Sequence, residues 1–580
     1  MAIDNLIQIG TIALTSTQNN FIRQRYLFQL IRLYFYSSHY DACVEFYRKH
    51  ANEFTFNNSI KDRSISYVAG ALFRTKQYAE SNYLFSLLYD KSVMFKSSAY
   101  LSFHPMEEAD WKASLAMAKS TREKNVLWHL LGIYADPLRA MKEIYKTQPE
   151  SDLLDLLLVR AVNIEEEKFV PRRFFKGGSM NDSAMNFNKD QIDIKLFNFI
   201  KSVAEKGNTH KPSVWNLAAG YFNIVFGEYQ KADQYLNKVL KTAATDTLVL
   251  KQAKLLQITS HIERTAKPDA IFEENILAEL IELKNEKEPG LRNLNAYEWA
   301  LKRLSEIYAQ NNDVVRSECL NAMRNPHFYN DTTQAAMMMA FMDKPNKTKF
   351  EEFILSVHPY KKGDIIDYQA IQLAYHYRLE EALAKYKTNN ITGGELPGNP
   401  FTIHINDCHD CDHANPNKTT YTKVSFLERM IKLQKDVNQN TAEAARSSFL
   451  LANGYYNMSY FGNARAMYQT NITGFVDMYP FYSYDDYTPL ANLAIYDCSL
   501  AQKYYHRAME LSTDREFKAK CCFMAAKCEQ NLFFMNKPKN YAGDFKAGSY
   551  YGMLKADYAN TRYFNEIIKE CGYFRTYMGR

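Results

Sequence analysis

One short segment carries the residues of this chain that are best suited to chemistry: His404, Cys408, His409, Cys411 and His413. The two cysteines have C-x-x-C spacing, which lets both sulfur atoms point at one ion. His413, together with His404 or His409, supplies the further ligands of a four-coordinate nitrogen and sulfur site, the set that suits zinc. A zinc site is therefore one interpretation of this loop.

Two other interpretations of the same loop stay open. Structural zinc sites usually draw ligand pairs from two separated segments, and the chain has no second pair of this kind. The cysteines can instead form a redox or disulfide pair, although no thioredoxin-like βαβ pattern surrounds them. In the third interpretation, the His and Asp residues form turns and face solvent. A c-type haem motif is excluded because Asp412 separates Cys411 from His413.

The elements around this loop follow a helical period. Leu153, Leu154, Leu157, Leu158 and Val162 form one apolar stripe of a helix. Only 16 Pro and 21 Gly occur among 580 residues, fewer than an all-β or doubly wound fold requires for its turns. A single core stops growing near about 250–300 residues, so several domains or an extended repeat array are expected. We expect an all-α chain.

An internal repeat supports an array. Residues 217–224 (LAAGYFNI) align with residues 451–458 (LANGYYNM). Twelve residues after the glycine of each copy comes an alanine, which gives the pairs Gly220–Ala232 and Gly454–Ala466. Small residues let two helix axes approach closely, so each copy predicts a helix–turn–helix unit that crosses at these positions.

These segments resemble tetratricopeptide repeats. The resemblance is carried by Gly220, Gly227, Tyr229, Ala232 and Leu236; by Trp128, Leu131, Gly132 and Ala140; by Ala501, Tyr505, Ala508 and Leu511; and by the weaker copies Tyr40, Cys43, Tyr47 and Tyr78, Ser81, Phe85. The spacing of the copies is irregular. The fold that we expect is therefore an irregular α-solenoid of antiparallel helical hairpins, interrupted by the long Cys/His loop.

The pattern divides the chain into five segments: N-terminal helical repeats (1–170), a linker or loop (171–190), central helical repeats (191–386), the Cys/His loop (387–422) and C-terminal helical repeats (423–580). The second segment is rich in Gly, Asn and Ser, and the fourth is the longest stretch without helical period.

The resemblance implies a non-catalytic scaffold that binds a protein or peptide in a groove lined by the first helix of each hairpin. On this chain that groove would be lined by Tyr221, Ile224, Tyr455 and Met458. Alternatively, these side chains pack against the neighbouring hairpin. Common catalytic signatures such as G-x-S-x-G, H-E-x-x-H and the Walker loop are absent from the sequence, which favours binding over catalysis. Two further hypotheses are a zinc protein centred on 404–413 and a carbohydrate-binding envelope protein, the latter suggested by 42 Tyr and many Asn.

Charge and hydropathy argue against a nucleic-acid partner and against a membrane span. The net charge of +6 comes from 71 basic and 65 acidic residues that are interleaved, so no nucleic-acid partner is expected. No apolar stretch is long enough for a membrane span. Met1 to Leu14 carries Asp4 and lacks a basic n-region, so it does not read as a signal peptide. The cytoplasm is the default expectation, and the envelope or periplasm is expected if the start is truncated.

Overall fold

The computed structural model describes residues 2–168, 191–243, 246–287, 293–321, 325–407, 419–440, 442–473, 495–536, 545 and 548–579. Among these residues the chain forms 29 α-helices and a single two-stranded β-ribbon. The predicted all-α class is therefore confirmed. The predicted linker at 171–190 lies outside the described residues.

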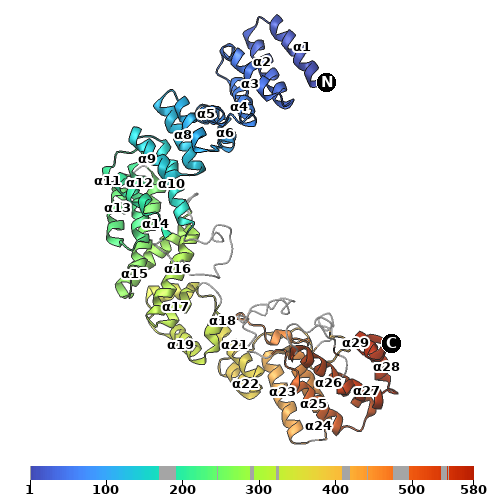
Figure 1. Ribbon diagram of the computed structural model, residues 1–580. Coiled ribbons are helices and arrows are strands. Elements are labelled where there is room, and N and C mark those ends of the chain that lie inside the picture. The colour runs from blue at the N-terminus through green and yellow to red at the C-terminus, as the bar shows by residue number, and fades with distance from the viewer. Residues whose placement is uncertain are drawn as a thin grey trace. The chain divides into compact units, whose positions relative to one another are not determined.

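The helices fall into two compact units (Figure 1). Unit 1 comprises residues 1–266 with 285–293, and unit 2 comprises residues 267–284 with 294–580, so the break falls within the segment 191–386 that the sequence pattern treats as one. Unit 1 contains α1 (Ala2–Ser16), α2 (Asn20–Tyr36), α3 (Tyr40–His50), α4 (Ser59–Arg74), α5 (Tyr78–Lys91), α6 (Lys96–Ser102), α7 (Glu108–Met117), α8 (Thr121–Tyr134), α9 (Pro137–Thr147), α10 (Leu153–Glu166), α11 (Ile194–Lys206), α12 (Pro212–Val225), α13 (Tyr229–Thr242) and α14 (Thr247–Glu263).

Unit 2 begins with α15 and contains the β-ribbon. Its elements are α15 (Ala270–Asn285), α16 (Asn293–Gln310), α17 (Val314–Leu320), α18 (Pro326–Asn330), α19 (Thr332–Asp343), α20 (Lys349–Val357), α21 (Lys362–Tyr375), α22 (Leu379–Thr388), β1 (Glu395–Leu396), β2 (Tyr421–Thr422), α23 (Lys423–Asn438), α24 (Ala444–Met458), α25 (Ser499–Leu511), α26 (Arg515–Asn536), α27 (Ser549–Asp557), α28 (Arg562–Glu570) and α29 (Gly572–Tyr577).

Among the described residues, one turn geometry joins two antiparallel helices at five places. Each turn has a residue in the left-handed region, with φ between 60° and 75°: Ser38, Lys76, Gly227, Asn312 and Tyr377. In each, the N–H of the following residue donates to the carbonyl five residues earlier, at 2.8–3.0 Å. This is the Schellman arrangement, which satisfies carbonyls at the end of a helix. The second helix of the hairpin begins at once.

The same register sets where the two helices of each hairpin cross. The residues seven before and five after the left-handed position are Ile31 and Cys43, Ala69 and Ser81, Gly220 and Ala232, Ser305 and Ser317, and Ala370 and Ala382. They lie close enough that the Ser81 hydroxyl donates to the Ala69 carbonyl at 2.8 Å. A Cβ on Gly220 would lie 2.7 Å from Leu236 Cδ2. The predicted close approach at Gly220 is therefore confirmed, and the twelve-residue spacing recurs in four other hairpins.

Six side-chain ion pairs in unit 1 join residues about one hairpin apart. Arg23–Glu53, Arg48–Glu80, Arg122–Asp90, Arg122–Asp152, Arg139–Glu108 and Arg264–Asp233 are separated by 30 to 32 residues. Exposed pairs of this kind each contribute only about 0–1 kcal/mol. Their similar separation is compatible with a helical repeat, in which neighbouring hairpins stack on one another.

The second predicted hairpin, at Gly454 and Ala466, does not form. Helix α24 ends at Met458, and Ala466 lies in a short 3₁₀ turn, Arg465–Met467. Gly454 does permit a close approach, but to the preceding helix, because a Cβ there would overlap Met430 of α23. The side-chain carbonyl of Asn457 accepts from the backbone N–H of Asn463, so the chain folds back on the last turn of α24.

Candidate functional site

The Cys/His loop (387–422) contains both strands of the β-ribbon. Strands β1 and β2 pair antiparallel, with Glu395 opposite Thr422 and Leu396 opposite Tyr421. The ring of Tyr421 also meets the ring of Phe401, with centroids 5.3 Å apart. The two ends of the loop are therefore held together although they are more than twenty residues apart in sequence.

A buried ion pair anchors the base of the loop. Lys423, the first residue of α23, is 3% exposed, and its Nζ lies 2.9 Å from Asp367 Oδ2 on α21. Asp367 Oδ1 also accepts a hydrogen bond from the Tyr386 hydroxyl of α22 at 2.5 Å. Burial lowers the pKa of Lys423, and the negative charge of Asp367 opposes that shift. The pair fixes three helices around the start of α23.

Two asparagines of α24 hold the first limb of the loop by its main chain. Asn453 Nδ2 donates to the Phe401 carbonyl at 2.8 Å. Asn457 Nδ2 donates to the carbonyls of Pro400 at 3.0 Å and Thr402 at 2.7 Å. The two side chains are four residues apart and so share one face of the helix. Residues 399–407 form a segment, here called the arm, that lies on this face.

Lys527 of α26 holds the end of the arm. Its side chain is 9% exposed, and Nζ lies 2.5 Å from Asp407 Oδ1. The same ammonium donates to the carbonyls of His404 at 3.1 Å and Ile405 at 3.3 Å. The Tyr456 hydroxyl of α24 donates to Asp407 Oδ1 at 2.9 Å. Burial, together with the Asp407 charge, raises the pKa of Tyr456 well above its usual value, so its hydroxyl stays a donor.

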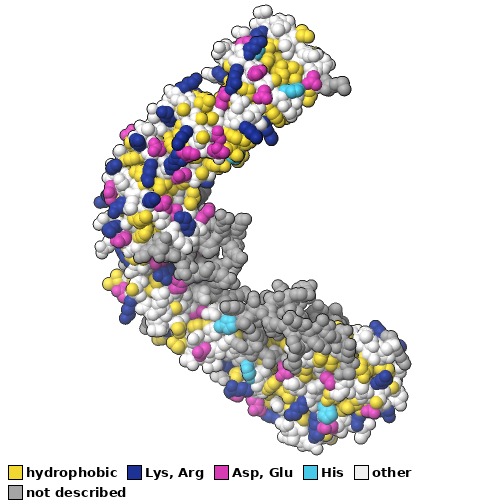
Figure 2. Space-filling view, in the orientation of Figure 1, with side chains coloured by type: hydrophobic (Ala, Val, Ile, Leu, Met, Phe, Trp, Pro, Cys, Tyr) yellow, Lys and Arg dark blue, Asp and Glu magenta, His cyan; other side chains and the backbone are white. Residues whose placement is uncertain are grey.

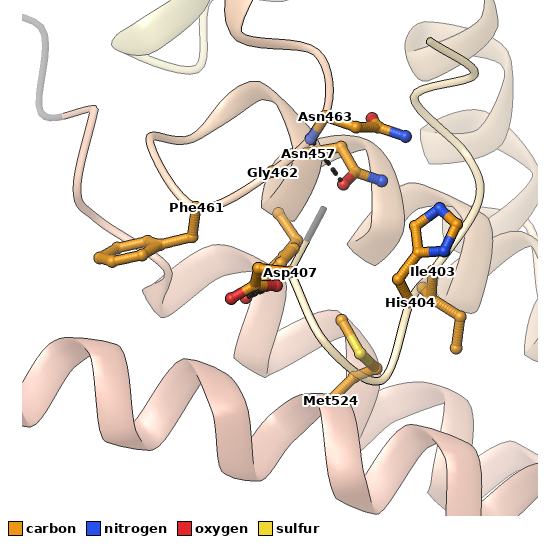
Figure 3. Close-up of a pocket in the computed structure, with 9 residues that line it drawn as sticks. Ile403, His404, Asp407, Asn457, Phe461, Gly462, Asn463 and Met524 are labelled. Atoms are coloured by element: carbon orange, nitrogen blue, oxygen red, sulfur yellow. Dashed lines mark hydrogen bonds between the residues drawn. The ribbon is translucent and has the colours of Figure 1, made fainter. Parts of the chain in front are cut away.

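A small pocket lies between the arm, α24 and α26. Figure 3 shows the arm turning back beside Met524, with His404 on one limb and Asp407 on the other. Asn457, on the last turn of α24, and Asn463, in the fold-back that follows, line the pocket. The pocket therefore brings an imidazole, a carboxylate and two amide groups together, and the carboxylate belongs to Asp407, the residue that precedes Cys408.

The predicted zinc ligands are only partly visible. His404 lies on the arm, whereas Cys408, His409, Cys411 and His413 lie outside the described residues. Within the part of the chain that the structure describes, no group of three or more His, Cys, Asp or Glu side chains is arranged to hold a metal ion. The zinc site stays a prediction.

The predicted groove residues pack between helices. Ile224 is 6%, Tyr455 4% and Met458 2% exposed. The Tyr455 ring stacks on Tyr504 with centroids 5.8 Å apart, and Tyr221 is half-buried against the core of unit 1. Three of the four side chains therefore offer almost no surface to a partner, which matches the alternative interpretation of packing against neighbouring helices.

Sequence reasoning did not single out the residues that bind the arm: Asn453, Tyr456, Asn457 and Lys527. One available sign was Lys527, a single cation within the otherwise apolar run FMAAKC. The sequence could not show that Asn457 binds another segment, because the asparagine at the equivalent repeat position, Asn223, donates to the Ala219 carbonyl of its own helix at 2.7 Å. One repeat position therefore serves two purposes.

Comparison with known proteins gives no family assignment. Neither protein-family models nor curated proteins match this chain. Among the described residues, no helix is long and apolar enough to cross a bilayer.

Proposed function

We propose that the chain is a non-catalytic scaffold of the tetratricopeptide-repeat kind that binds a protein or peptide partner. The observation that carries this proposal is the recurrence of one hairpin geometry at five positions, with the same turn and the same crossing. Stacked hairpins present one face of each first helix in register, which gives an extended surface suited to a peptide segment.

A peptide selection tests this proposal. The full chain is immobilised and screened against a random twelve-residue phage library, and selected sequences are synthesised for fluorescence anisotropy. Hydrogen exchange then locates the bound peptide. We expect binding, with protection on first helices of the hairpins such as α2, α4 and α12. If no selected peptide binds in solution, or if bound peptides protect only loops, the proposal fails.

We propose zinc binding at the Cys/His loop as a second function. The supporting observation is that buried contacts hold the arm up to Asp407, which directly precedes Cys408. A ligand loop that starts from a fixed point loses less conformational entropy when it closes on a metal. Cys408 and Cys411 would bind with His413 and either His404 or His409.

Metal analysis of the purified chain tests this second proposal. We expect about one zinc per chain in the wild type and its loss in Cys408→Ser and Cys411→Ser. Cys43→Ser is the matched control, because Cys43 is a buried cysteine of unit 1, whereas the loop belongs to unit 2. Wild-type protein without zinc after purification in zinc-supplemented buffer would rule out the site.

A further inference from the structure

Helices α2 and α4 carry arginine and tyrosine residues at equivalent positions on one face. The sets are Arg25, Gln29, Arg32 and Tyr36 on α2, and Arg63, Tyr67, Gly70 and Arg74 on α4. Spacings of four, three and four place each set along one side of its helix. The two sets are offset by 38 residues, as are the turn residues Ser38 and Lys76, so both occupy the same position in their hairpins.

The two faces meet as one surface. The hydroxyl oxygens of Tyr36 and Tyr67 are 3.4 Å apart, and their ring centroids are 5.7 Å apart. The Arg32 guanidinium lies 5.6 Å from the centre of the Tyr36 ring. A Cβ on Gly70 would lie 3.1 Å from the Phe35 ring, so this glycine lets α2 and α4 approach closely. We call Arg32, Tyr36, Arg63, Tyr67 and Arg74 the arginine strip.

The arginines of the strip differ from others in unit 1. Arg32, Arg63 and Arg74 are exposed, and within the described ranges none has a carboxylate at ion-pair distance. By contrast, five arginines elsewhere in the unit pair with an acid about one hairpin away: Arg23, Arg48, Arg122, Arg139 and Arg264. On the face of the molecule shown in Figure 2, basic and acidic side chains are likewise interspersed. The strip thus gathers guanidinium groups without an acidic partner; Arg32 interacts with the Tyr67 hydroxyl inside the strip, and its other donors remain available.

We propose that the arginine strip binds an acidic segment of a partner protein. This inference rests on the proposed function and names the surface and the chemistry of the peptide. Guanidinium groups bind carboxylates with two parallel hydrogen bonds, and the tyrosines add flat apolar contact. Arg63 and Arg74 are eleven residues apart, about 16 Å along α4. That length matches about five residues of extended peptide.

The charge of the strip favours a peptide over a nucleic acid. Three arginines neutralise few phosphates, whereas nucleic-acid affinity grows with the number of phosphate contacts. The chain's net charge of only +6 adds little long-range attraction.

Fluorescence anisotropy with the full chain tests the inference. The probes are a labelled (Glu-Ala)5 peptide, its (Gln-Ala)5 analogue and a twelve-nucleotide single-stranded DNA. We expect the acidic peptide to bind about tenfold more tightly than the neutral one, and 500 mM NaCl to weaken it several-fold relative to 50 mM. The triple variant Arg32→Gln, Arg63→Gln, Arg74→Gln should lose at least about tenfold in affinity.

The matched control is the triple variant Arg48→Gln, Arg139→Gln, Arg264→Gln, which removes the same charge from paired arginines. We expect its affinity for the acidic peptide to stay within about twofold of wild type. Helical circular dichroism and melting of both triple variants verify folding. Equal losses in the two triple variants, tighter binding of the DNA than of the peptide, or no preference for Glu over Gln would each overturn the inference.

The two proposals fail in different ways. If peptides from the phage selection bind without acidic preference and are unaffected by the strip variant, the inference fails and the scaffold function stands. If no peptide of any charge binds, both fail.

Discussion

Replacing Gly132 with alanine tests the close crossing of helices on which the repeat depends. Gly132 lies on α8, where a Cβ would sit 2.7 Å from the Cβ of Ala140 on α9 and 2.7 Å from Leu157 Cδ2 on α10. Nonbonded carbons normally lie about 3.5–4.0 Å apart. The Ala140 Cβ cannot rotate away because it is bonded directly to the backbone, so α8 and α9 must separate by about 1 Å.

Two opposing effects set the size of the change. Overpacking of a core costs about 1–3 kcal/mol, whereas Gly→Ala in a helix gains about 1 kcal/mol of intrinsic helix stability. Because two contacts fall at 2.7 Å, the overpacking cost lies in the upper part of its range, about 2–3 kcal/mol, and we expect Gly132→Ala to destabilise this region by about 1–2 kcal/mol. Since 1.4 kcal/mol is a factor of ten, amides of residues 121–147 that exchange by local opening should exchange about five- to thirtyfold faster in hydrogen-exchange mass spectrometry.

Two further variants make the test specific. Gly552→Ala on α27 meets only Tyr577 Oη at 3.7 Å, an ordinary contact, so it should be neutral or stabilising by up to about 1 kcal/mol. Adding Ala140→Gly to Gly132→Ala removes one of the two overlapping atoms and should recover part of the lost protection. Protection of α8 in Gly132→Ala at or above the wild-type level would refute the steric argument.

Three other predictions concern buried ionisable groups and can be checked by urea denaturation. Burial lowers the pKa of His129 to about 4. Because the unfolded chain takes up this proton below about pH 6.5, the free energy of unfolding of unit 1 should fall by up to about 3 kcal/mol between pH 6.5 and 4, and His129→Gln should reduce this pH dependence. Burial raises the pKa of Glu318 to about 8, so the stability that its protonated carboxyl contributes is present below about pH 4.5 and is lost as the pH rises towards 8. Glu318→Gln should therefore be more stable than the wild type by a few kcal/mol at pH 8, and equal stability of the two proteins at that pH would contradict this. Lys423→Met leaves the partly buried Asp367 without its cation and should lower the free energy of unfolding by about 3 kcal/mol. The double variant Lys423→Met, Asp367→Asn should lose less stability, and equal losses in the two variants would show that the pair is not coupled.

Local patterns predicted much of the helical architecture. The apolar stripe from Leu153 to Leu158 lies in the core of unit 1, and the Gly220–Ala232 spacing marks a real crossing. Both depend only on residues within one or two turns of helix or within a single hairpin. The recurring turn was harder to see, because four of its five left-handed residues are not glycine.

The arm shows why the candidate site could not be predicted. Lys527 and Asp407 are 120 residues apart in sequence, and only packing of α26 against the loop brings them together. Nothing local distinguishes Asn453, which binds the Phe401 carbonyl, from an asparagine that caps its own helix.

The contrast between the two aligned copies gives the physical reason. Period and small residues decide that a segment is helical and how closely a neighbour can approach, since these are properties of one helix surface. Which neighbour occupies that surface depends on contacts between distant segments. Gly220 meets the helix that follows it, whereas Gly454 meets the helix before it. Tyr455 is buried for the same reason: Tyr504, 49 residues further on, covers its ring.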